Sequence, residues 1–297
     1  MFIIDKRIAI IIPTYNRIKS LQNLLFQLQQ QINLAHSDVI VVVDGSNDDT
    51  IKVLKEKYSF VHTVMGDGSW WYTKSINEGL KYAQKFNPDY CLILNDDLIL
   101  SENYIVALLN SYSQIPYASI VTSLTLTNDT QKKIMFSGVK KIKTWSLQQR
   151  KYHPFLTVYD GIKLIGLHPT QIFPGRGTII PNSIILDLNY LDEYFIQYHS
   201  DGDFCLRALK KGYKVYVNWE AIIYTNLKDT NSATSYLNNS VTAIIKSFFN
   251  PYSRNYIPQK IKFIYKHGYK LLLPVTLLIF IFTILSKAVL KKFSNGS

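Results

Sequence analysis

Two acidic side chains stand directly after an apolar run in this sequence, where Asn95-Asp96-Asp97 follows residues 90–94. An apolar run of this length is typical of a buried strand, and ligand sites in open α/β sheets lie at the carboxyl ends of strands. Carboxylate oxygens are hard ligands that suit Mg²⁺ or Mn²⁺. The triplet therefore predicts a divalent-cation site used in nucleotide chemistry. Because Asn and Asp also form ordinary turns after strands, a purely structural turn remains the alternative at this point.

Apolar runs alternate with helical spacing along the first hundred residues. Strands are predicted at residues 8–12, 39–43, 60–65 and 90–94, and helices over 21–28, around 53–54 and over 70–86. Strands that alternate with helices form a mostly parallel sheet with right-handed crossovers. We therefore expect an α/β fold in which Asp44, Asp67 and Asp97, each near a strand end, become neighbours on one edge. Residues 119–170 show no clear pattern.

The turn after the first strand, residues 13–17 (PTYNR), contains no glycine. A dinucleotide-binding turn would carry G-x-G-x-x-G here, and a P-loop would carry its glycines and lysine. Since neither motif is present, the phosphates of a nucleotide must be neutralised by a metal ion and by side chains. The acids at positions 96 and 97 are the candidates for holding that metal.

Composition predicts a folded chain in a reducing compartment. With 297 residues of which 47% are hydrophobic, the chain can bury the core of one large α/β domain, or of one domain with an appendage. Cys91 and Cys205 both fall within apolar patterns, which argues against a disulfide framework, and no zinc-ligand spacing occurs. The run at residues 8–12 is too short for the core of a signal peptide, so we expect the catalytic part in the cytosol.

Positive charge is concentrated at the end of the chain. The net charge is +12, and nine of the 33 Lys and Arg residues follow Asp229, after which no acid occurs. Aromatic residues are mixed with these cations ahead of an apolar run at 271–285. This pattern predicts a segment that lies on or in an anionic membrane surface, at the inner face of the cell membrane, and does not cross it. A tail helix packed on the domain is the alternative, and nucleic acid is a less favoured partner because it needs no such apolar run.

Four ordered motifs carry a resemblance to a known family. They are residues 8–17 (IAIIIPTYNR), 41–50 (VVVDGSNDDT), 94–98 (LNDDL) and 200–213 (SDGDFCLRALKKGY), the last preceded by DEYF at 192–195. Together they closely resemble the family 2 inverting glycosyltransferases with the GT-A fold, over roughly residues 8 to 220. The resemblance implies a GT-A domain at 1–229, with a nucleotide half to about 115 and an acceptor half from about 116. The tail at 230–297 is not part of the resemblance, and its basic, aromatic and apolar composition predicts membrane association.

The resemblance also implies roles for residues of the nucleotide half. Asp44 would accept a hydrogen bond from the imide of uracil or thymine, and Asp97 would bind Mg²⁺ or Mn²⁺. Asn95 would contact the ribose, and Asp96 would lie near the sugar or the ribose. The other implied donor contacts are Pro13, Thr14 and Tyr15 at the base, Asp67 at the nucleoside, and Lys74 and Asn77 near the diphosphate.

On the acceptor side the resemblance implies that Asp201 is the general base. Asp203 would contact the acceptor or its sugar and, lying close by, raise the pKa of Asp201. Residues 173–181 (FPGRGTIIP) would border both sugars through Arg176. Trp71 could stack on a sugar ring, although an aromatic residue at a helix start is more often part of the core. Asp201 could also simply cap the following helix, with Asp203 in its first turn.

The expected activity is inverting transfer of a sugar from a UDP- or dTDP-sugar to a hydroxyl of a saccharide or lipid-linked saccharide, in cell-surface polysaccharide synthesis. Two other functions remain open on the residues. A sugar-phosphate nucleotidyltransferase would share the sheet and the metal but needs a glycine-rich basic loop after the first strand. A non-catalytic carbohydrate-binding membrane protein would explain the aromatic residues and the tail but not Asp97 and Asp201.

Overall fold

The computed structural model describes residues 6–31, 36–115, 118–159, 164–226 and 241–294, with the backbone alone at 241 and 287–294. The strands are β1 (Ile8–Thr14), β2 (Ser37–Asp44), β3 (Val61–Gly66), β4 (Tyr90–Ile93), β5 (Ile99–Leu100), β6 (Ser119–Thr127), β7 (Ile134–Phe136), β8 (Val139–Ile142), β9 (Gln149–Lys151), β10 (Leu167–Pro169), β11 (Thr178–Pro181) and β12 (Lys214–Thr225). The helices are α1 (Ile18–Gln29), α2 (Thr50–Lys57), α3 (Trp71–Ala83), α4 (Tyr104–Asn110), α5 (Asn182–Asp187), α6 (Ser200–Lys210), α7 (Val241–Ser247), α8 (Ile257–His267) and α9 (Leu273–Ser294).

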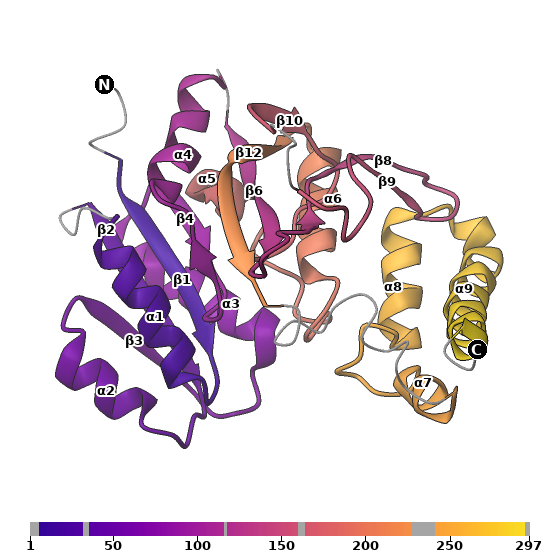
Figure 1. The fold of residues 1–297 in the computed structure, drawn as a ribbon, viewed down its shortest axis with the longest axis horizontal. Coiled ribbons are helices and arrows are strands. Elements are labelled where there is room, and N and C mark those ends of the chain that lie inside the picture. Colours follow the sequence, from indigo (N-terminus) through magenta and orange to yellow (C-terminus); the bar gives the residue numbers. More distant parts are fainter. Residues whose placement is uncertain (1–5, 32–35, 116–117, 160–163, 227–240, 295–297) are drawn as a thin grey trace.

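A ten-stranded sheet forms the centre of the molecule (Figure 1), in the order β10-β12-β6-β11-β4-β1-β2-β3 with β5 beside β12 and β7 beside β6. The β1–β2, β2–β3, β1–β4 and β6–β12 pairs are parallel, whereas β11 runs antiparallel to both β4 and β6. Helices α1 and α4 pack on one face, and α3, α5 and α6 pack on the other. The predicted α/β fold with a mostly parallel sheet is therefore confirmed.

Both faces of the first strands are buried, which explains their continuous apolar sequences. Residues 39–43 of β2 and 9–12 of β1 have no solvent-exposed surface. The parallel register pairs Thr14 with Val43 and Asp44 with Gly66, so the strands end together at one edge. That edge carries the polar residues that follow β1, β2 and β4. The third strand is Val61–Gly66, one residue later than the pattern at 60–65 predicts.

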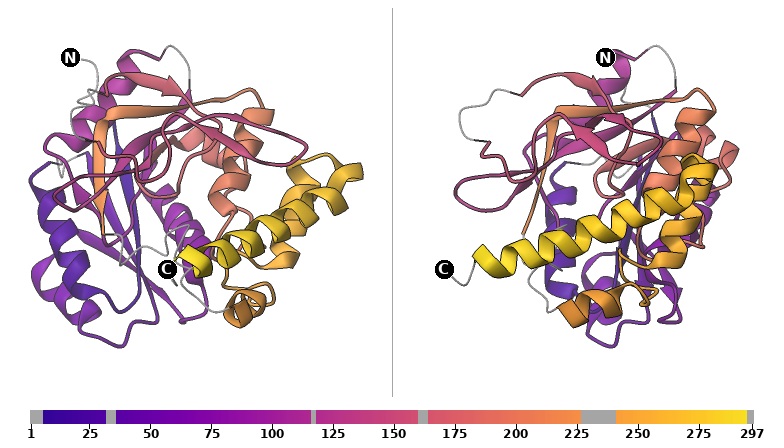
Figure 2. Two further views of the ribbon diagram at one scale, coloured as in Figure 1. Left: turned by 45° about the vertical axis from the view of Figure 1, so that its right-hand side comes forward. Right: turned by 90° about the vertical axis from the view of Figure 1, so that its right-hand side faces the viewer.

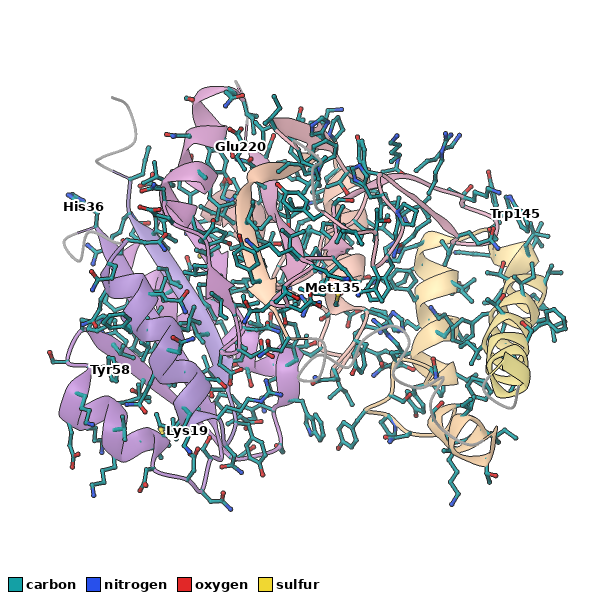
Figure 3. The ribbon with its side chains drawn as sticks, in the orientation of Figure 1. Lys19, His36, Tyr58, Met135, Trp145 and Glu220 are labelled. Atoms are coloured by element: carbon teal, nitrogen blue, oxygen red, sulfur yellow. The ribbon has the colours of Figure 1, made fainter. Side chains whose placement is uncertain are left out.

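The segment from 119 to 170, which shows no sequence pattern, builds the second half of the sheet and a hairpin. Strand β6 lies parallel to β12, and the short strands β8 and β9 form a separate two-stranded sheet. Trp145, in the turn of this hairpin, lies beside the start of α9 (Figure 3), and its carbonyl accepts a hydrogen bond of 2.6 Å from Thr276 Oγ1. Strands as short as three or four residues are too brief for a periodicity to be visible in sequence.

Helices α7, α8 and α9 lie beyond the sheet, next to α6 (Figure 1). Helix α8 contacts α6, and α9 runs across the outer side of α8 (Figure 2). Ile244, Phe248 and Ile284 form a small apolar cluster between α7 and α9. The alternative of a tail packed on the domain is thus correct for α8. None of the helices in the described part of the chain has the length and hydrophobicity needed to span a bilayer.

Candidate active site

A pocket of about 890 Å³ opens at the edge where β1, β2 and β4 end. Its wall is completed by the loop before β11, the start of α6, and the segment that leads into α8. Among the residues predicted from sequence, the structure brings together at this pocket Pro13, Thr14, Tyr15, Asp44, Trp71, Asn95, Asp96, Asp97, Arg176 and Asp201. The nucleotide-side and acceptor-side motifs, although more than a hundred residues apart, thus face one cavity.

Asp44 builds the wall at one end of this pocket. Its carboxylate accepts hydrogen bonds from the backbone amides of Gly68 (2.8 Å), Trp70 (3.0 Å) and Trp71 (2.9 Å). The approach requires a glycine at position 66, because a Cβ there would lie 2.5 Å from the Asp44 carboxylate. A carboxylate has about four lone-pair positions, so Asp44 keeps the capacity to accept from one further donor such as a base imide.

Asp96 lies buried at the floor of the pocket. It accepts a hydrogen bond of 2.7 Å from Thr14 Oγ1 and lies 3.3 Å from Arg17 Nη1. Burial raises the pKa of Asp96 to about 6, although the hydrogen bond from Thr14 and the charge of Arg17 oppose the shift. The bond to Thr14 ties the end of β1 to the turn after β4. It therefore positions the neighbouring Asp97.

Asn95 and Asp97 carry oxygens without a hydrogen-bond partner. Asn95 Oδ1 and Asp97 Oδ1 are both fully buried, and neither has a partner among the described residues. Such an oxygen is costly to bury unless something binds it. The donor set is oxygen only, which fits Mg²⁺ or Mn²⁺. Within the described ranges no three His, Cys, Asp or Glu side chains are grouped to hold a metal, so the chain would supply part of a coordination shell.

Arg17 is a site residue that the sequence reading missed. Its Nη1 lies 3.1 Å from Asp97 Oδ2 and so bridges Asp97 to Asp96. The residue ends the glycine-free turn at residues 13–17 (PTYNR). A basic residue in a phosphate-binding turn without glycine was the available signal. Arg17 partly neutralises two adjacent carboxylates that would otherwise repel each other.

Asp201 lines the same pocket from the first turn of α6. Its Oδ2 accepts from the Gly175 amide (3.1 Å) and its Oδ1 from the Gly202 amide (2.8 Å). Burial raises the pKa of Asp201 above its ordinary value, and these amides together with Arg254 limit the shift. A carboxylate with a raised pKa is a stronger base than a free aspartate. The bond to the loop at Gly175 shows that Asp201 does more than cap its own helix.

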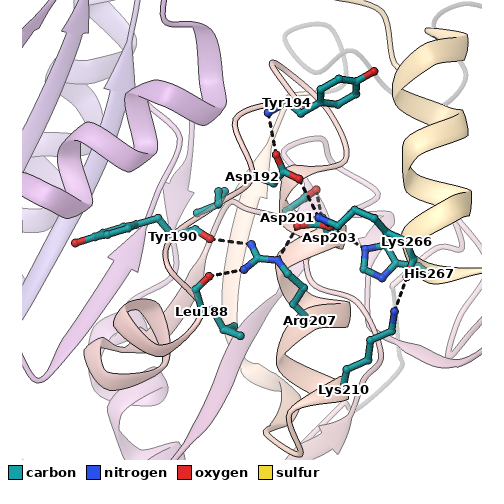
Figure 4. Close-up of polar contacts among 12 residues, drawn as sticks. Leu188, Tyr190, Asp192, Tyr194, Asp201, Asp203, Arg207, Lys210, Lys266 and His267 are labelled. Atoms are coloured by element: carbon teal, nitrogen blue, oxygen red, sulfur yellow. Dashed lines mark hydrogen bonds and ion pairs between the residues drawn. The ribbon is translucent and has the colours of Figure 1, made fainter.

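Asp203, only two residues further on, does not line the pocket, and its carboxylate meets side chains of α6 and α8 (Figure 4). Its side chain is completely buried and lies 2.8 Å from Arg207 Nε, 2.5 Å from Lys266 Nζ and 2.8 Å from His267 Nε2. Burial favours its protonated form, but these hydrogen bonds outweigh burial and hold the pKa well below the ordinary value. The predicted contact of Asp203 with the acceptor is therefore corrected, because its carboxylate docks α8 onto α6.

Three residues predicted near the donor also have other partners. Asn77 is buried, where it donates to Leu191 O and accepts from Leu191 N, each at 3.0 Å. Asp67 accepts hydrogen bonds from the amide and hydroxyl of Ser69, and the Lys74 ammonium lies 5.1 Å from the centre of the Trp70 ring. None of the three lines the pocket. Asn77 thus holds the loop at residues 191–195 through its backbone, and Asp67 and Lys74 lie outside the pocket wall.

Residues of the tail complete the pocket, which the sequence reading did not anticipate. Arg254, Lys260 and Phe263 all line it, and Trp71 stacks on Tyr252 with ring centroids 3.8 Å apart. In sequence these residues are indistinguishable from the neighbouring cations and aromatics of the basic tail. The membrane-facing role predicted for the whole tail is therefore too broad, since part of it faces the catalytic pocket.

Comparison with known proteins decides the family. Residues 9–171, more than half of the chain, match the description "Glycosyl transferase family 2". The chain belongs to this family. The predicted resemblance to this family is confirmed.

Solved structures confirm the GT-A fold of this family 2 protein. A structure of GalNAc-T7 with UDP, GalNAc and Mn²⁺ superposes with a TM-score of 0.61 at 10% identity, over 94% of this chain and 57% of the other. S. aureus TarS in complex with UDP-GlcNAc superposes with a TM-score of 0.52 at 14% identity, over 88% of this chain and 71% of the other. At such low identities the likeness establishes the fold alone.

Two curated archaeal relatives match parts of the chain. A low-salt glycan biosynthesis hexosyltransferase of Haloferax volcanii is 22% identical over 217 residues, 70% of this chain and 63% of the relative. A UDP-N-acetylglucosamine–dolichyl-phosphate N-acetylglucosaminyltransferase of Methanococcus voltae is 44% identical over 52 residues, 18% of this chain and 20% of the relative. The chain thus spans less than two thirds of the length of either relative.

Proposed function

We propose that this family 2 protein is an inverting glycosyltransferase. It transfers a sugar from a UDP- or dTDP-sugar to a hydroxyl of a saccharide or lipid-linked saccharide in cell-surface polysaccharide synthesis. One observation carries the proposal: Asp97 and Asp201, which come from opposite halves of the sequence, line a single pocket. A donor held at Asp97 presents its anomeric carbon toward Asp201, which is the arrangement that a single inverting displacement requires. The names of the two relatives, both sugar transferases, support this substrate class.

The nucleoside is proposed to bind between the ends of β1 and β2. Pro13, Thr14 and Tyr15 line this part of the pocket, and Asp44 stands at its wall with one acceptor position to spare. A carboxylate at that position recognises the N–H of an imide and rejects a ring nitrogen lone pair. Uracil and thymine carry such an N–H, which supports a UDP- or dTDP-sugar.

Asp97, with Asn95 beside it, is proposed to hold Mg²⁺ or Mn²⁺ through the oxygens that lack other partners. A bound cation supplies Lewis-acid stabilisation of the departing nucleoside diphosphate. Mg²⁺ sites commonly use one or two carboxylates together with substrate phosphates, which agrees with the small donor set here. Arg17 and Arg176 border the same space and are placed to neutralise the remaining phosphate charge.

Asp201 is proposed to act as the general base. The acceptor oxygen forms a bond to the anomeric carbon while the bond from that carbon to the phosphate oxygen breaks, and the acceptor proton passes to the Asp201 carboxylate. The nucleoside diphosphate leaves with the electron pair of the broken bond. Because attack and departure occur on opposite faces of the sugar, the anomeric configuration inverts. The amides of Gly175 and Gly202 hold the base in place.

The outer face of α9 is proposed to lie on an anionic membrane surface. Val275, Leu278 and Phe282 on α9 are exposed at helical spacing, with Phe282 at 73% exposure, and Leu271 just before the helix is 95% exposed. Basic residues of the tail flank this stripe, and lipid headgroups attract such cations. The proposal places the protein at the inner face of the cell membrane. The predicted domain boundary at residue 229 lies outside the described residues, and we retain 1–229 and 230–297 as proposed units.

Release of free nucleoside diphosphate tests the activity. The full chain is incubated with UDP- and dTDP-sugars and Mn²⁺, with membrane lipids as acceptor source, and the anomeric configuration of the product is read by NMR. We expect UDP or dTDP release that depends on both acceptor and metal. Retention of configuration contradicts the mechanism. Pyrophosphate release from a nucleoside triphosphate and a sugar phosphate would identify a nucleotidyltransferase instead, although the turn after β1 lacks the glycines that such an enzyme needs.

A further inference from the structure

Two cations of the tail line the pocket without a carboxylate partner. Arg254 lies in the loop before α8, and Lys260 lies on α8. Among the described residues neither forms an ion pair within 4.0 Å, and the same holds for Arg176 in the facing loop. Most other cations near this side of the molecule are paired, as Lys266 is with Asp203. Arg254 acts on Asp201 only at longer range, so neither tail cation is matched by a carboxylate in direct contact.

Both side chains are held in the pocket by the surrounding structure. His199, at the start of α6, donates from Nε2 to the Arg254 carbonyl at 3.2 Å, and the Arg254 guanidinium lies 5.5 Å from the centre of the Tyr198 ring. The Lys260 ammonium lies 4.5 Å from the centre of the Phe280 ring on α9. These contacts place the two cations beside the first turn of α6, which also carries Asp201.

The charge of this region favours an anion. Burial, together with the charge of Arg254, lowers the pKa of Lys260 to about 8. Burial and the charges of the same two cations hold the pKa of His199 well below its ordinary value, so His199 is neutral at pH 7. Asp201 is the nearby acid, and it already accepts two backbone hydrogen bonds. Partly desolvated cations that repel one another are stabilised when an anionic ligand binds.

We propose that Arg254 and Lys260 form a subsite for a phosphate group carried by the acceptor. This inference rests on the proposed function, since it needs Asp201 to mark the acceptor side. We assign the donor diphosphate to Asp97, Arg17 and Arg176. Arg254 and Lys260 line the pocket from α8 and the loop before it, so they are available to a different phosphate group. A phosphate monoester carries up to two negative charges, and the planar fork of an arginine matches its oxygens.

The position of the subsite also indicates how such an acceptor arrives. Phe280, which covers Lys260, belongs to α9, the helix whose outer face we propose to lie on the membrane. A phosphate at Arg254 and Lys260 would therefore lie close to the lipid surface. A phosphate on a lipid and a phosphate on a soluble saccharide share the same chemistry at the cations. They differ in whether an apolar chain adds to the affinity.

Calorimetric titration of the full-length protein, saturated with UDP and Mn²⁺, tests the subsite. The probes are citronellyl phosphate, citronellol as its phosphate-free alcohol, and glycerol phosphate. The test variant is Arg254→Gln with Lys260→Gln, and the control is Lys52→Gln with Lys55→Gln, which removes two exposed charges from α2. We expect the test variant to bind citronellyl phosphate about tenfold to hundredfold more weakly, because charge-assisted hydrogen bonds are lost. The control should bind within about twofold of the parent.

The outcomes separate this subsite from the proposed function. Tighter binding of citronellyl phosphate than of glycerol phosphate supports a lipid-borne phosphate, and equal binding supports a soluble one. Equal binding of citronellyl phosphate and citronellol, or an unchanged affinity in the test variant, overturns the subsite. A test variant that loses UDP affinity overturns it too, because the cations then serve the donor. If the parent itself fails to bind UDP, the proposed function fails. Should the double variant not fold, Lys260→Gln alone must still weaken phosphate binding.

Discussion

Replacing Asp201 with asparagine should stop turnover without weakening donor binding. In the proposed mechanism Asp201 accepts the acceptor proton and contacts neither the nucleotide nor the metal. Asparagine keeps the size and one acceptor oxygen, so the bond from the Gly175 amide can persist, but it takes no proton. General-base assistance is worth on the order of 10²–10⁴-fold in rate. We therefore expect kcat to fall by about this factor, while the affinities for UDP and Mn²⁺ stay within about twofold.

The same substitution should leave the fold as stable as before, or slightly more stable. Burial raises the folded-state pKa of Asp201 above its unfolded value, so the ionised carboxylate is disfavoured in the folded protein at neutral pH. A neutral amide removes that unfavourable term. We expect the melting temperature of Asp201→Asn to equal or exceed that of the parent. A loss of activity at full stability then reports chemistry and not unfolding.

Asp203→Asn is the matched control, since it is the same chemical change two residues away. Asp203 is fully buried among Arg207, Lys266 and His267, and removing its charge leaves these cations without their partner. Removing one partner of a buried ion pair costs about 3–5 kcal/mol, so the melting temperature should drop clearly. At a temperature where Asp203→Asn is folded, its rate of nucleoside diphosphate release should stay within about tenfold of the parental rate.

Three measurements check these predictions. Turnover is measured as the initial rate of nucleoside diphosphate release, UDP affinity by calorimetric titration, and the melting temperature by thermal unfolding. If Asp203→Asn abolishes turnover at full stability while Asp201→Asn remains active, Asp203 is the base and the assignment is wrong. If both variants stay active and folded, the inverting mechanism proposed here is wrong. A large loss of UDP affinity in Asp201→Asn would place this side chain on the donor side.

The remaining predictions concern the metal, the membrane and pH. Asp97→Asn should lower turnover by orders of magnitude and abolish the rise in melting temperature that Mn²⁺ causes in the presence of UDP; parental turnover would exclude a metal role. Leu278→Glu combined with Phe282→Glu should release the protein from anionic vesicles, whereas Phe26→Glu on α1, where Phe26 is 60% exposed, should not; unchanged vesicle binding by the double variant contradicts the proposed surface. Because hydrogen bonds depress the pKa of Asp203, its stabilisation is present above its unfolded pKa of about 4 and is lost as the pH falls further. Chemical denaturation at several pH values should show that the free energy of unfolding falls with pH in the parent and falls less in Asp203→Asn. The same dependence on pH in both proteins would refute this prediction.

The sequence by itself determined the nucleotide half of the fold. Continuous apolar runs at 8–12 and 39–43 specify strands that are buried on both faces, and the helical spacing between them specifies right-handed crossovers. Those two local patterns are sufficient to place Asp44 and Asp97 on one edge of a sheet. The motifs then identified the family. Short strands such as β8 and β9 could not be predicted, because three or four residues carry no measurable period.

Tertiary structure alone decided which acid of α6 faces the pocket. Successive residues of an α-helix are rotated by about 100°, so Asp201 and Asp203 point in nearly opposite directions although the sequence sets them side by side. One meets the Gly175 loop, and the other meets Lys266 and His267 of α8. Nothing in the local sequence states where α8 will dock.

The docking of α8 likewise decided the role of the basic tail. In the sequence, Arg254 and Lys260 belong to the same run of cations and aromatics as residues proposed to meet lipid. The fold divides this run, because the buried contacts of Asp203 fix α8 against α6 and so place Lys260 of α8, and Arg254 in the loop before it, at the pocket. Charge in a sequence reports an affinity for anions. Only the packing of helices determines whether that anion is a membrane surface or a group bound beside the candidate base.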